Sequence, residues 1–213
     1  MIKAVIFDLD GLLIDSEIIS YKIYKEILHQ FGHNFTIEEY TQNYSGKTEV
    51  KNVTNLIATY NLPWTLDEGL ENVYKIENRL IAQGVDLKYG AKELLSYLKD
   101  NNFKIAIASS STRDRALTIL KQHNLIEYFD EFVFGHEVKN GKPNPDIFIK
   151  ACDKISEKPE VCLVLEDSEA GIQSAYSANI PVICIPDMKI PNKDYLDMTK
   201  AVLNSLEEVV NYL

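Results

Sequence analysis

The sequence lacks several features that would mark a membrane protein, a disulfide-stabilised protein or a histidine-rich metal protein. It has no run of roughly 18 to 20 uninterrupted apolar residues, the length that a membrane-spanning helix needs. The 3 cysteines, Cys152, Cys162 and Cys184, lie in apolar surroundings without Cys-x-x-Cys spacing, so we expect buried reduced thiols. The 4 histidines show no metal-site spacing either. Since a strand is expected directly after the first residue, we expect no signal peptide, a cytoplasmic location and no membrane partner.

Basic residues are scarce relative to acidic ones. The chain has 22 Lys and Arg against 32 Asp and Glu, which gives a formal net charge of −10. Proteins that bind nucleic-acid polymers use clustered Lys and Arg, so this charge argues against such a partner. A small phosphorylated metabolite remains compatible with it, because a bound metal can supply positive charge locally. The 213 residues allow one ordinary domain and a smaller one, and we expect a monomer.

Two closely spaced carboxylates near the N-terminus form the first candidate site. Residues 2–7 are a mostly apolar, β-branched run of buried-strand length, and Asp8, Asp10 and Gly11 follow it. Open α/β sheets bind ligands at the carboxyl ends of their strands. Two acids this close repel each other unless a cation or a shared proton intervenes, and Mg²⁺ prefers such oxygen ligands. The alternative is a surface turn, in which Asp and Gly are common.

The segment over residues 16–83 has a helical pattern throughout. Ser16 begins an amphipathic helix that Gly32 ends. Thr36 begins the second, where Thr-Ile-Glu-Glu resembles a capping box. Two more helices are expected over residues 50–60 and 66–82. An all-helical insertion of this length after the first strand indicates a small separate domain.

From Gly90 onward, amphipathic helices alternate with apolar strands. The expected helices cover residues 91–99, 113–123, 145–154, 169–178 and 205–212. The expected strands cover residues 103–108, 131–134, 161–165, 181–185 and 201–203. This alternation predicts an α/β fold with a parallel sheet covered on both faces.

Two groups of polar residues occupy loops that open predicted helices. Ser109 and Ser110 begin a hydroxyl-rich turn, where hydroxyls and free N–H groups can bind phosphate. Simple helix capping is the alternative for these serines. Lys142 lies in a loop stiffened by flanking prolines, which can direct its ammonium group at one point. A solvated surface lysine is the ordinary alternative.

A second acidic pair, Glu166 and Asp167, follows another predicted buried strand. An acidic pair is unusual as a helix cap, although Asp167 or Ser168 alone would serve as one. If this strand lies beside the first one, the pair completes a metal site with Asp8 and Asp10. Carboxylate, hydroxyl and ammonium groups are therefore expected at one edge of the sheet.

In this order along the chain, these residues resemble the haloacid dehalogenase superfamily. Asp8-x-Asp10-Gly11 is similar to its first motif, Ser109 to its second, Lys142 to its third and Glu166-Asp167 to its fourth. The helical insertion resembles the cap of the subgroup that contains β-phosphoglucomutase and pseudouridine-5′-phosphatase. The resemblance implies a Rossmann-like, parallel-sheet core over residues 1–15 and 84–213, with a helical cap domain over residues 16–83.

The resemblance also implies phosphoryl transfer through an aspartyl-phosphate, with Mg²⁺ as the cofactor. Asp8 would be the nucleophile, and Asp10 would act as general acid and then as general base. Asp8, the Asp10 carbonyl group and Asp167 would hold the Mg²⁺, with Glu166 either ligating it or supporting a ligand. Lys142 would act catalytically and would bind the phosphate together with Leu9, Ser109 and Ser110.

A Mg²⁺-dependent phosphatase acting on a small phosphomonoester, either a sugar phosphate or a nucleotide-like compound, is the expected function. A phosphosugar mutase of the β-phosphoglucomutase type is the alternative, but those mutases carry a histidine where this chain has Ser20. A non-enzymatic alternative is a phospho-accepting receiver, although a switch has no use for a substrate lid. Gly46 and Lys47 resemble the cap loop that reaches the substrate in related enzymes. An exposed charge before a helix is the alternative for Lys47.

Overall fold

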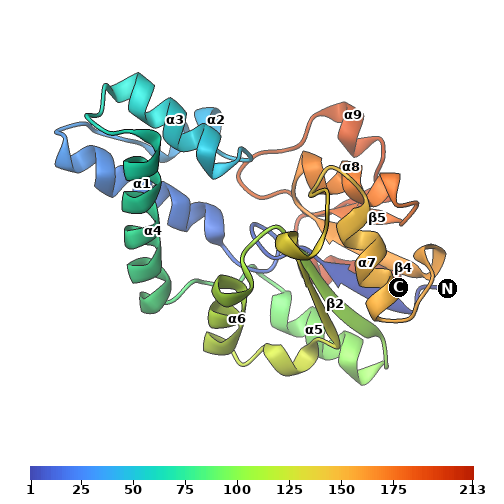
Figure 1. Ribbon diagram of the computed structural model, residues 1–213. Helices are drawn as coiled ribbons and strands as arrows, with labels where there is room; N and C mark the ends of the chain where they lie inside the picture. The colour runs from blue at the N-terminus through green and yellow to red at the C-terminus, as the bar shows by residue number, and fades with distance from the viewer. The chain divides into compact units, whose positions relative to one another are not determined.

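The chain forms two compact units, one made of residues 1–15 and 86–213 and the other of residues 16–85. The computed structural model describes all residues from 1 to 213, and Figure 1 shows the course of the chain. None of the helices combines the length and the apolar character that crossing a membrane requires.

The larger unit is built on a six-stranded parallel sheet in the order β3-β2-β1-β4-β5-β6. Its strands are short, and those at the centre are fully buried because they consist almost entirely of apolar residues. The strands are β1 (Ala4–Phe7), β2 (Lys104–Ser109), β3 (Glu131–Phe134), β4 (Cys162–Glu166), β5 (Val182–Cys184) and β6 (Ala201–Val202). The predicted α/β fold with a parallel sheet is confirmed.

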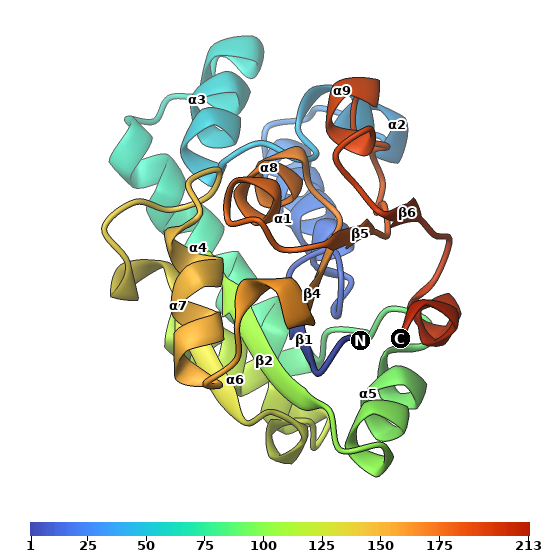
Figure 2. The ribbon, with the colours of Figure 1, turned by 90° about the vertical axis from the view of Figure 1, so that its right-hand side faces the viewer.

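Helices cover both faces of the sheet. Helices α7 and α8 pack on one face, where they share a core with residues such as Ile6 and Val164. Helix α5 packs on β2 and on the C-terminal 3₁₀ helix η4, away from that core (Figure 2). The α-helices of this unit are α5 (Ala91–Asp100), α6 (Arg113–Gln122), α7 (Asp146–Lys154), α8 (Glu169–Ser177) and α9 (Lys193–Leu196). The 3₁₀ helices are η1 (Ile126–Tyr128), η2 (Gly135–Glu137), η3 (Pro159–Val161) and η4 (Leu206–Tyr212).

Successive strands are added on one side of β1 first and on its other side afterwards. The chain runs from β1 through β2 to β3 on one side, and then crosses to β4 on the other side of β1. Phe7, the last residue of β1, pairs with Ile107 of β2 and Leu165 of β4. The residues that follow these strands therefore gather beside Asp8, at the type of position where open α/β sheets bind ligands.

Residues 16–85 form a unit of four helices. Helix α4 packs against both α1 and α3, and an aromatic cluster that includes Tyr24, Tyr40 and Tyr44 fills part of its interior. The helices are α1 (Ser16–Gln30), α2 (Ile37–Asn43), α3 (Glu49–Tyr60) and α4 (Leu66–Gln83). All four expected helices are present, with ends that differ by only a few residues from those predicted.

The chain leaves the sheet unit and re-enters it through two paired segments. The Asp15 N–H donates to the Asp86 carbonyl oxygen over 2.9 Å. The Lys88 N–H donates to the Leu13 carbonyl oxygen, also over 2.9 Å. These two hydrogen bonds hold the outgoing and returning segments together.

Three details of the secondary structure differ from the expectation, and the first is that the helix predicted over residues 205–212 is the 3₁₀ helix η4, with no side-chain hydrogen bond from Ser205. The capping box predicted at Thr36 is only half formed: Thr36 Oγ1 accepts the Glu39 N–H over 3.2 Å, but the Glu39 carboxylate accepts the Tyr60 hydroxyl instead. Helix α9 was not predicted, because it is a single short turn in a segment rich in Pro, Asn and Asp. A complete capping box occurs at Thr65, where Glu68 returns the hydrogen bond.

We expect Thr65→Ala to lower the free energy of unfolding by about 1 kcal/mol, because it removes the side-chain acceptor of the capping box. Thr65 Oγ1 accepts the Glu68 N–H, and the Thr65 N–H donates to Glu68 Oε2 over 2.8 Å. Thr48 caps α3 without a side-chain hydrogen bond, so Thr48→Ala is a matched control with a smaller expected loss. Urea unfolding followed by circular dichroism measures both variants. Equal losses would contradict the assignment.

Candidate active site

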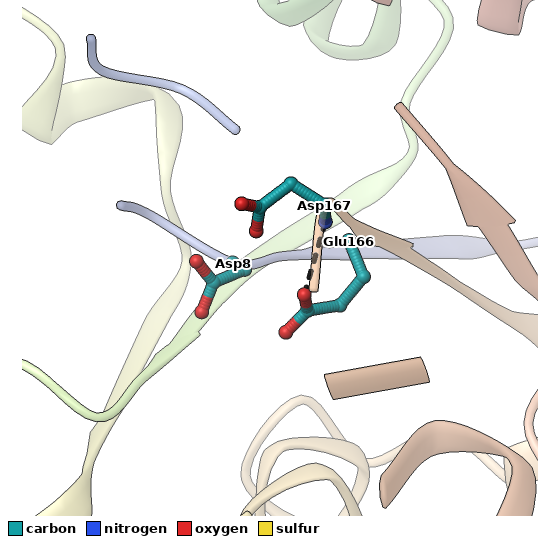
Figure 3. A group of neighbouring side chains, drawn as sticks. All are labelled: Asp8, Glu166 and Asp167. Carbon is teal, nitrogen blue, oxygen red and sulfur yellow. Dashed lines mark hydrogen bonds between the residues drawn. The ribbon is translucent and has the colours of Figure 1, made fainter. Parts of the chain in front are cut away.

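Three carboxylates meet beyond the carboxyl ends of β1 and β4. Asp8 directly follows β1, Glu166 is the last residue of β4, and Asp167 comes next. One oxygen from each of the three lies within 4.8 Å of the others (Figure 3). The Asp8 N–H donates to the Leu165 carbonyl oxygen over 3.1 Å, which continues the pairing of the two strands past their ends. The sheet itself therefore brings residues from distant parts of the sequence together.

Lys142 is inserted between two of these acids. Its Nζ lies 2.5 Å from Asp8 Oδ1 and 2.6 Å from Glu166 Oε1, and only 7% of its side chain is exposed. The Phe148 ring lies against the ammonium group, with its centroid 4.8 Å from Nζ. Lys142 is thus a buried cation, and it does not have the solvated position that was the alternative.

Glu166 is fully buried, and both of its oxygens are occupied by protein donors. Oε1 accepts from Lys142, while Oε2 accepts the N–H groups of Asp167 and Ser168 over 3.0 Å each. The Ser168 hydroxyl also donates to Oε2 over 2.9 Å. The geometry therefore favours Glu166 as a residue that orients Lys142 and the start of α8, rather than as a metal ligand itself.

Burial and charge oppose each other at Asp8. Burial raises the pKa of Asp8 to about 7, although Lys142 acts in the opposite direction, and the charges of Glu166 and Asp10 raise it further. Burial alone would lower the pKa of Lys142, but the charges of Asp8 and Glu166 outweigh it and raise that pKa above its usual value. A single ammonium faces three carboxylates, so the cluster has a deficit of positive charge.

These residues fit a hard divalent cation. The three acids supply only oxygen donors, which Mg²⁺ prefers, and the excess negative charge favours a cation. Since Glu166 already accepts from four protein donors, Asp8 and Asp167 are the side chains that are more available to hold the ion.

Asp10 lies outside the cluster and pairs with Arg115. Asp10 Oδ1 accepts from Arg115 Nη1 over 2.7 Å, and the same nitrogen donates to Ser111 Oγ over 2.7 Å. The Asp10 side chain is 33% exposed, in contrast to the buried Asp8. Gly11 follows with a φ of 82°, a backbone conformation that glycine adopts without strain. Asp10 can therefore face a ligand that enters from solvent.

Besides Lys142, the predicted phosphate-binding residues lie at or just beyond the carboxyl ends of β1 and of the neighbouring strand β2. Ser109 ends β2 and is 1% exposed, and its Oγ accepts the Ser111 N–H over 3.0 Å. Ser110 is exposed in the turn that follows. Leu9 is buried between the two aspartates. Because β2 pairs directly with β1, Ser109 emerges at the same edge of the sheet as Asp8.

Gly46 and Lys47 belong to the helical unit. They lie between α2 and α3, where Lys47 Nζ donates to the Asn43 carbonyl oxygen. Gly46 has a φ of 72°. Their contact with a substrate stays a prediction.

Three residues near the site, Arg115, Lys88 and Asp187, were not predicted from the sequence. A signal for Arg115 was available: Arg113 and Arg115 place positive charge in the first turn of α6, which the helix dipole disfavours unless an anion is near. Lys88 and Asp187 form an ion pair over 2.6 Å between two segments far apart in sequence. No local pattern predicts that pair.

Comparisons with known proteins identify relatives over the full length of the chain. Residues 5–185 match the family model described as haloacid dehalogenase-like hydrolase. A phosphorylated carbohydrates phosphatase from Thermotoga maritima is 31% identical over 212 residues, which cover 99% of this chain and 98% of that protein. A Drosophila melanogaster protein described as a probable pseudouridine-5′-phosphatase is 32% identical over 209 residues, covering 95% and 89%. The crystal structure of β-phosphoglucomutase from Clostridium difficile superposes with a TM-score of 0.76 at 25% identity, covering 98% and 93%.

We expect Gly171→Ala to displace Glu166. A Cβ at residue 171 would lie 1.7 Å from Glu166 Oε1, and that carboxylate cannot move away because it is fully buried and hydrogen-bonded. Breaking the pairing with Lys142 should cost about 3 kcal/mol or more of the free energy of unfolding, which outweighs the better helix propensity of Ala.

Gly141→Ala is the matched control, because nothing lies within 4 Å of a Cβ at residue 141. Thermal and urea unfolding of both variants test the expectation. A Gly171→Ala protein as stable as the Gly141→Ala protein would contradict the close packing of Glu166.

Proposed function

Because the chain belongs to the haloacid dehalogenase-like hydrolase family, we propose that it is a phosphatase that hydrolyses a small phosphomonoester through an aspartyl-phosphate on Asp8. The observation that carries this proposal is the position of Asp8, buried at the end of β1 and in contact with Lys142 beside Glu166 and Asp167. A sugar phosphate is the favoured class of substrate, in keeping with the name of the Thermotoga maritima relative. A nucleotide-like phosphomonoester is the second class, in keeping with the Drosophila relative.

In the first half of the reaction, Asp8 attacks phosphorus and the ester oxygen leaves. The carboxylate forms a bond to phosphorus as the bond to the alcohol oxygen breaks, and Asp10 donates a proton to that oxygen. Asp10 first exchanges its contact with Arg115, whose Nη1 donates to Oδ1 over 2.7 Å, for a contact with the leaving oxygen. In the second half, Asp10 accepts a proton from the water that attacks the phosphorus. Inorganic phosphate is then released and Asp8 is regenerated.

Lys142 and the neighbouring donors stabilise the phosphoryl group. When Asp8 shares its charge with phosphorus, the Lys142 ammonium can turn to a phosphoryl oxygen while Glu166 keeps its position. Ser109, Ser110 and the backbone N–H of Leu9 are proposed as further donors. Electrostatic positioning of this kind supplies most of the catalysis in phosphoryl transfer.

We propose Mg²⁺ as the cofactor, held by Asp8, Asp167 and the Asp10 carbonyl oxygen. The ion would neutralise charge on the phosphoryl oxygens and on Asp8, which the single ammonium of Lys142 cannot do for the whole cluster. The acidic cluster supports this assignment.

We propose that the helical unit serves as a cap over the substrate, with Gly46 and Lys47 as contacts. Exclusion of water by such a lid would protect the aspartyl-phosphate between the two half-reactions. We propose that the protein is a cytoplasmic monomer. Its substrate would be a small metabolite rather than a nucleic-acid polymer.

A phosphosugar mutase is the second candidate, and the likeness to β-phosphoglucomutase supports it. The same aspartyl-phosphate would then pass its phosphoryl group to a sugar hydroxyl rather than to water. Ser20 argues against this candidate, as the sequence analysis indicated. Membership of the hydrolase family disfavours the phospho-accepting receiver.

We expect the Asp8→Asn protein to release no measurable phosphate from p-nitrophenyl phosphate in the presence of Mg²⁺, because the amide cannot act as the nucleophile. Asp197→Asn is the matched control: Asp197 is 62% exposed in an ion pair with Lys193, and this variant should keep wild-type turnover. Near-normal hydrolysis by a folded Asp8→Asn protein would overturn the proposed mechanism.

A parallel screen of hexose 1-phosphates decides between the two candidates, since isomerisation faster than hydrolysis would favour the mutase.

We expect Asp10→Asn to lower kcat about 10²- to 10⁴-fold for alkyl phosphates, because they need a proton on the leaving oxygen. The loss should be smaller for the phosphorylation step with p-nitrophenyl phosphate, whose phenolate leaves without full protonation. Single-turnover measurements with both substrates test this. Equal losses would place the general acid elsewhere.

A further inference from the structure

Asp187 has a buried carboxylate oxygen that no protein group satisfies. Its side chain is 8% exposed and follows β5 in the sheet unit. Oδ1 pairs with Lys88 Nζ over 2.6 Å, whereas Oδ2 is buried without a hydrogen-bond partner. Buried polar atoms in native proteins almost always have a partner, and an exception indicates a water, an ion or a functional role. We therefore expect Asp187 Oδ2 to accept a hydrogen bond from a group outside the chain.

The unpartnered oxygen lies near Asp167, one of the three carboxylates of the candidate metal site. A Cβ placed on Gly11 would lie 2.4 Å from Asp167 Oδ2 and 3.2 Å from Asp187 Oδ2. Both carboxylate oxygens thus approach the same side of Gly11, whose lack of a side chain makes room for them. Asp187 and Asp167 are therefore neighbours, although 20 residues separate them in the sequence.

The groups around Asp187 carry more negative than positive charge, which favours the binding of another cation. Lys88 and the Met188 N–H favour its ionised form, while Asp15 and burial oppose it, and the balance raises the pKa of Asp187. Lys88 is the one cation among these groups, and it faces two carboxylates in addition to the nearby Asp167. A divalent ion at Asp167 would reduce this repulsion.

We propose that Asp187 is a positioning residue of the metal site, whose Oδ2 accepts a hydrogen bond from the hydration shell of a divalent cation held by Asp8 and Asp167. This inference rests on the proposed function, because it takes that cation as given. Mg²⁺ keeps several waters when a protein binds it, and these waters need acceptors. Glu166 already accepts from four protein donors, whereas Oδ2 of Asp187 has no partner and is open as an acceptor.

Lys88 has a defined part in this arrangement. Its ammonium holds Oδ1, so the carboxylate cannot rotate freely and Oδ2 stays directed toward Asp167. Partners of this kind, one layer outside the ligands, typically account for 10- to 100-fold in metal affinity. Asp187 would thus contribute to metal binding without touching the metal.

Metal titration tests the inference independently of catalysis. Mn²⁺ serves as the probe, with the free ion measured by electron paramagnetic resonance and Mg²⁺ added as competitor. We expect Asp187→Asn to weaken Mn²⁺ binding about 10-fold relative to wild type. Asp167→Asn should abolish binding, and the exposed Asp197→Asn should leave it unchanged.

A second variant covers the case in which Asp187→Asn leaves Lys88 unpaired and fails to fold. The double variant Asp187→Asn/Lys88→Met removes the ion pair as a unit and should show the same weakening of Mn²⁺ binding. Circular dichroism of each variant establishes that the protein is folded. A merely structural role of Asp187 would change the melting temperature but leave the Mn²⁺ affinity unchanged.

The outcomes separate this inference from the proposed function. If Asp167→Asn loses Mn²⁺ while the Asp187 variants bind it within twofold of wild type, the role of Asp187 is refuted and the metal site stands. If Asp167→Asn binds Mn²⁺ like wild type, the metal site itself is refuted, and the role of Asp187 fails with it.

Discussion

The buried ammonium of Lys142 is the interaction on which the arrangement of the acidic edge depends. Three carboxylates placed within 4.8 Å of one another would repel strongly in a region that excludes water. Lys142 contacts two of them directly and relieves part of that repulsion. The cost of burying it is offset by two ion pairs and by the Phe148 ring. Without this cation, the carboxylates of Asp8 and Glu166 would lie at the ends of two adjacent strands with no positive charge between them.

The fold converts sequence distance into proximity by simple means. Parallel strands all end at the same edge, so the residue after β1 and the residues that end β4 become neighbours without any special loop. The loop before α7 then needs only to direct Lys142 into the gap. Glycine supplies the remaining space: Gly171 admits the Glu166 carboxylate, and Gly11 admits Asp167 and Asp187. Charge, strand order and the absence of two side chains together define the site.

The sequence was sufficient to predict the α/β fold, because alternating apolar strands and amphipathic helices leave few other arrangements. It also indicated Asp8, Lys142 and Glu166, since each follows or approaches a recognisable strand or helix end. It could not indicate Lys88 or Asp187, because their pairing depends on how two remote loops meet in space. The Thr36 cap shows the same limit on a smaller scale. The local pattern correctly predicted the hydrogen bond to the Thr36 side chain, but the Glu39 carboxylate accepts from the hydroxyl of the distant Tyr60.

The paired segments at residues 13–15 and 86–88 have a consequence for the modularity of the chain. Because the Asp15 N–H reaches the Asp86 carbonyl oxygen over 2.9 Å, the polypeptide departs and returns at practically one point. A short turn could bridge that point, and the sheet would lose none of its strands. Excision of the intervening four helices, or grafting of a foreign insert in their place, is therefore a local operation on the backbone. Evolution can exchange the insert at this junction while Asp8, Glu166 and Asp167 keep their positions at the sheet edge.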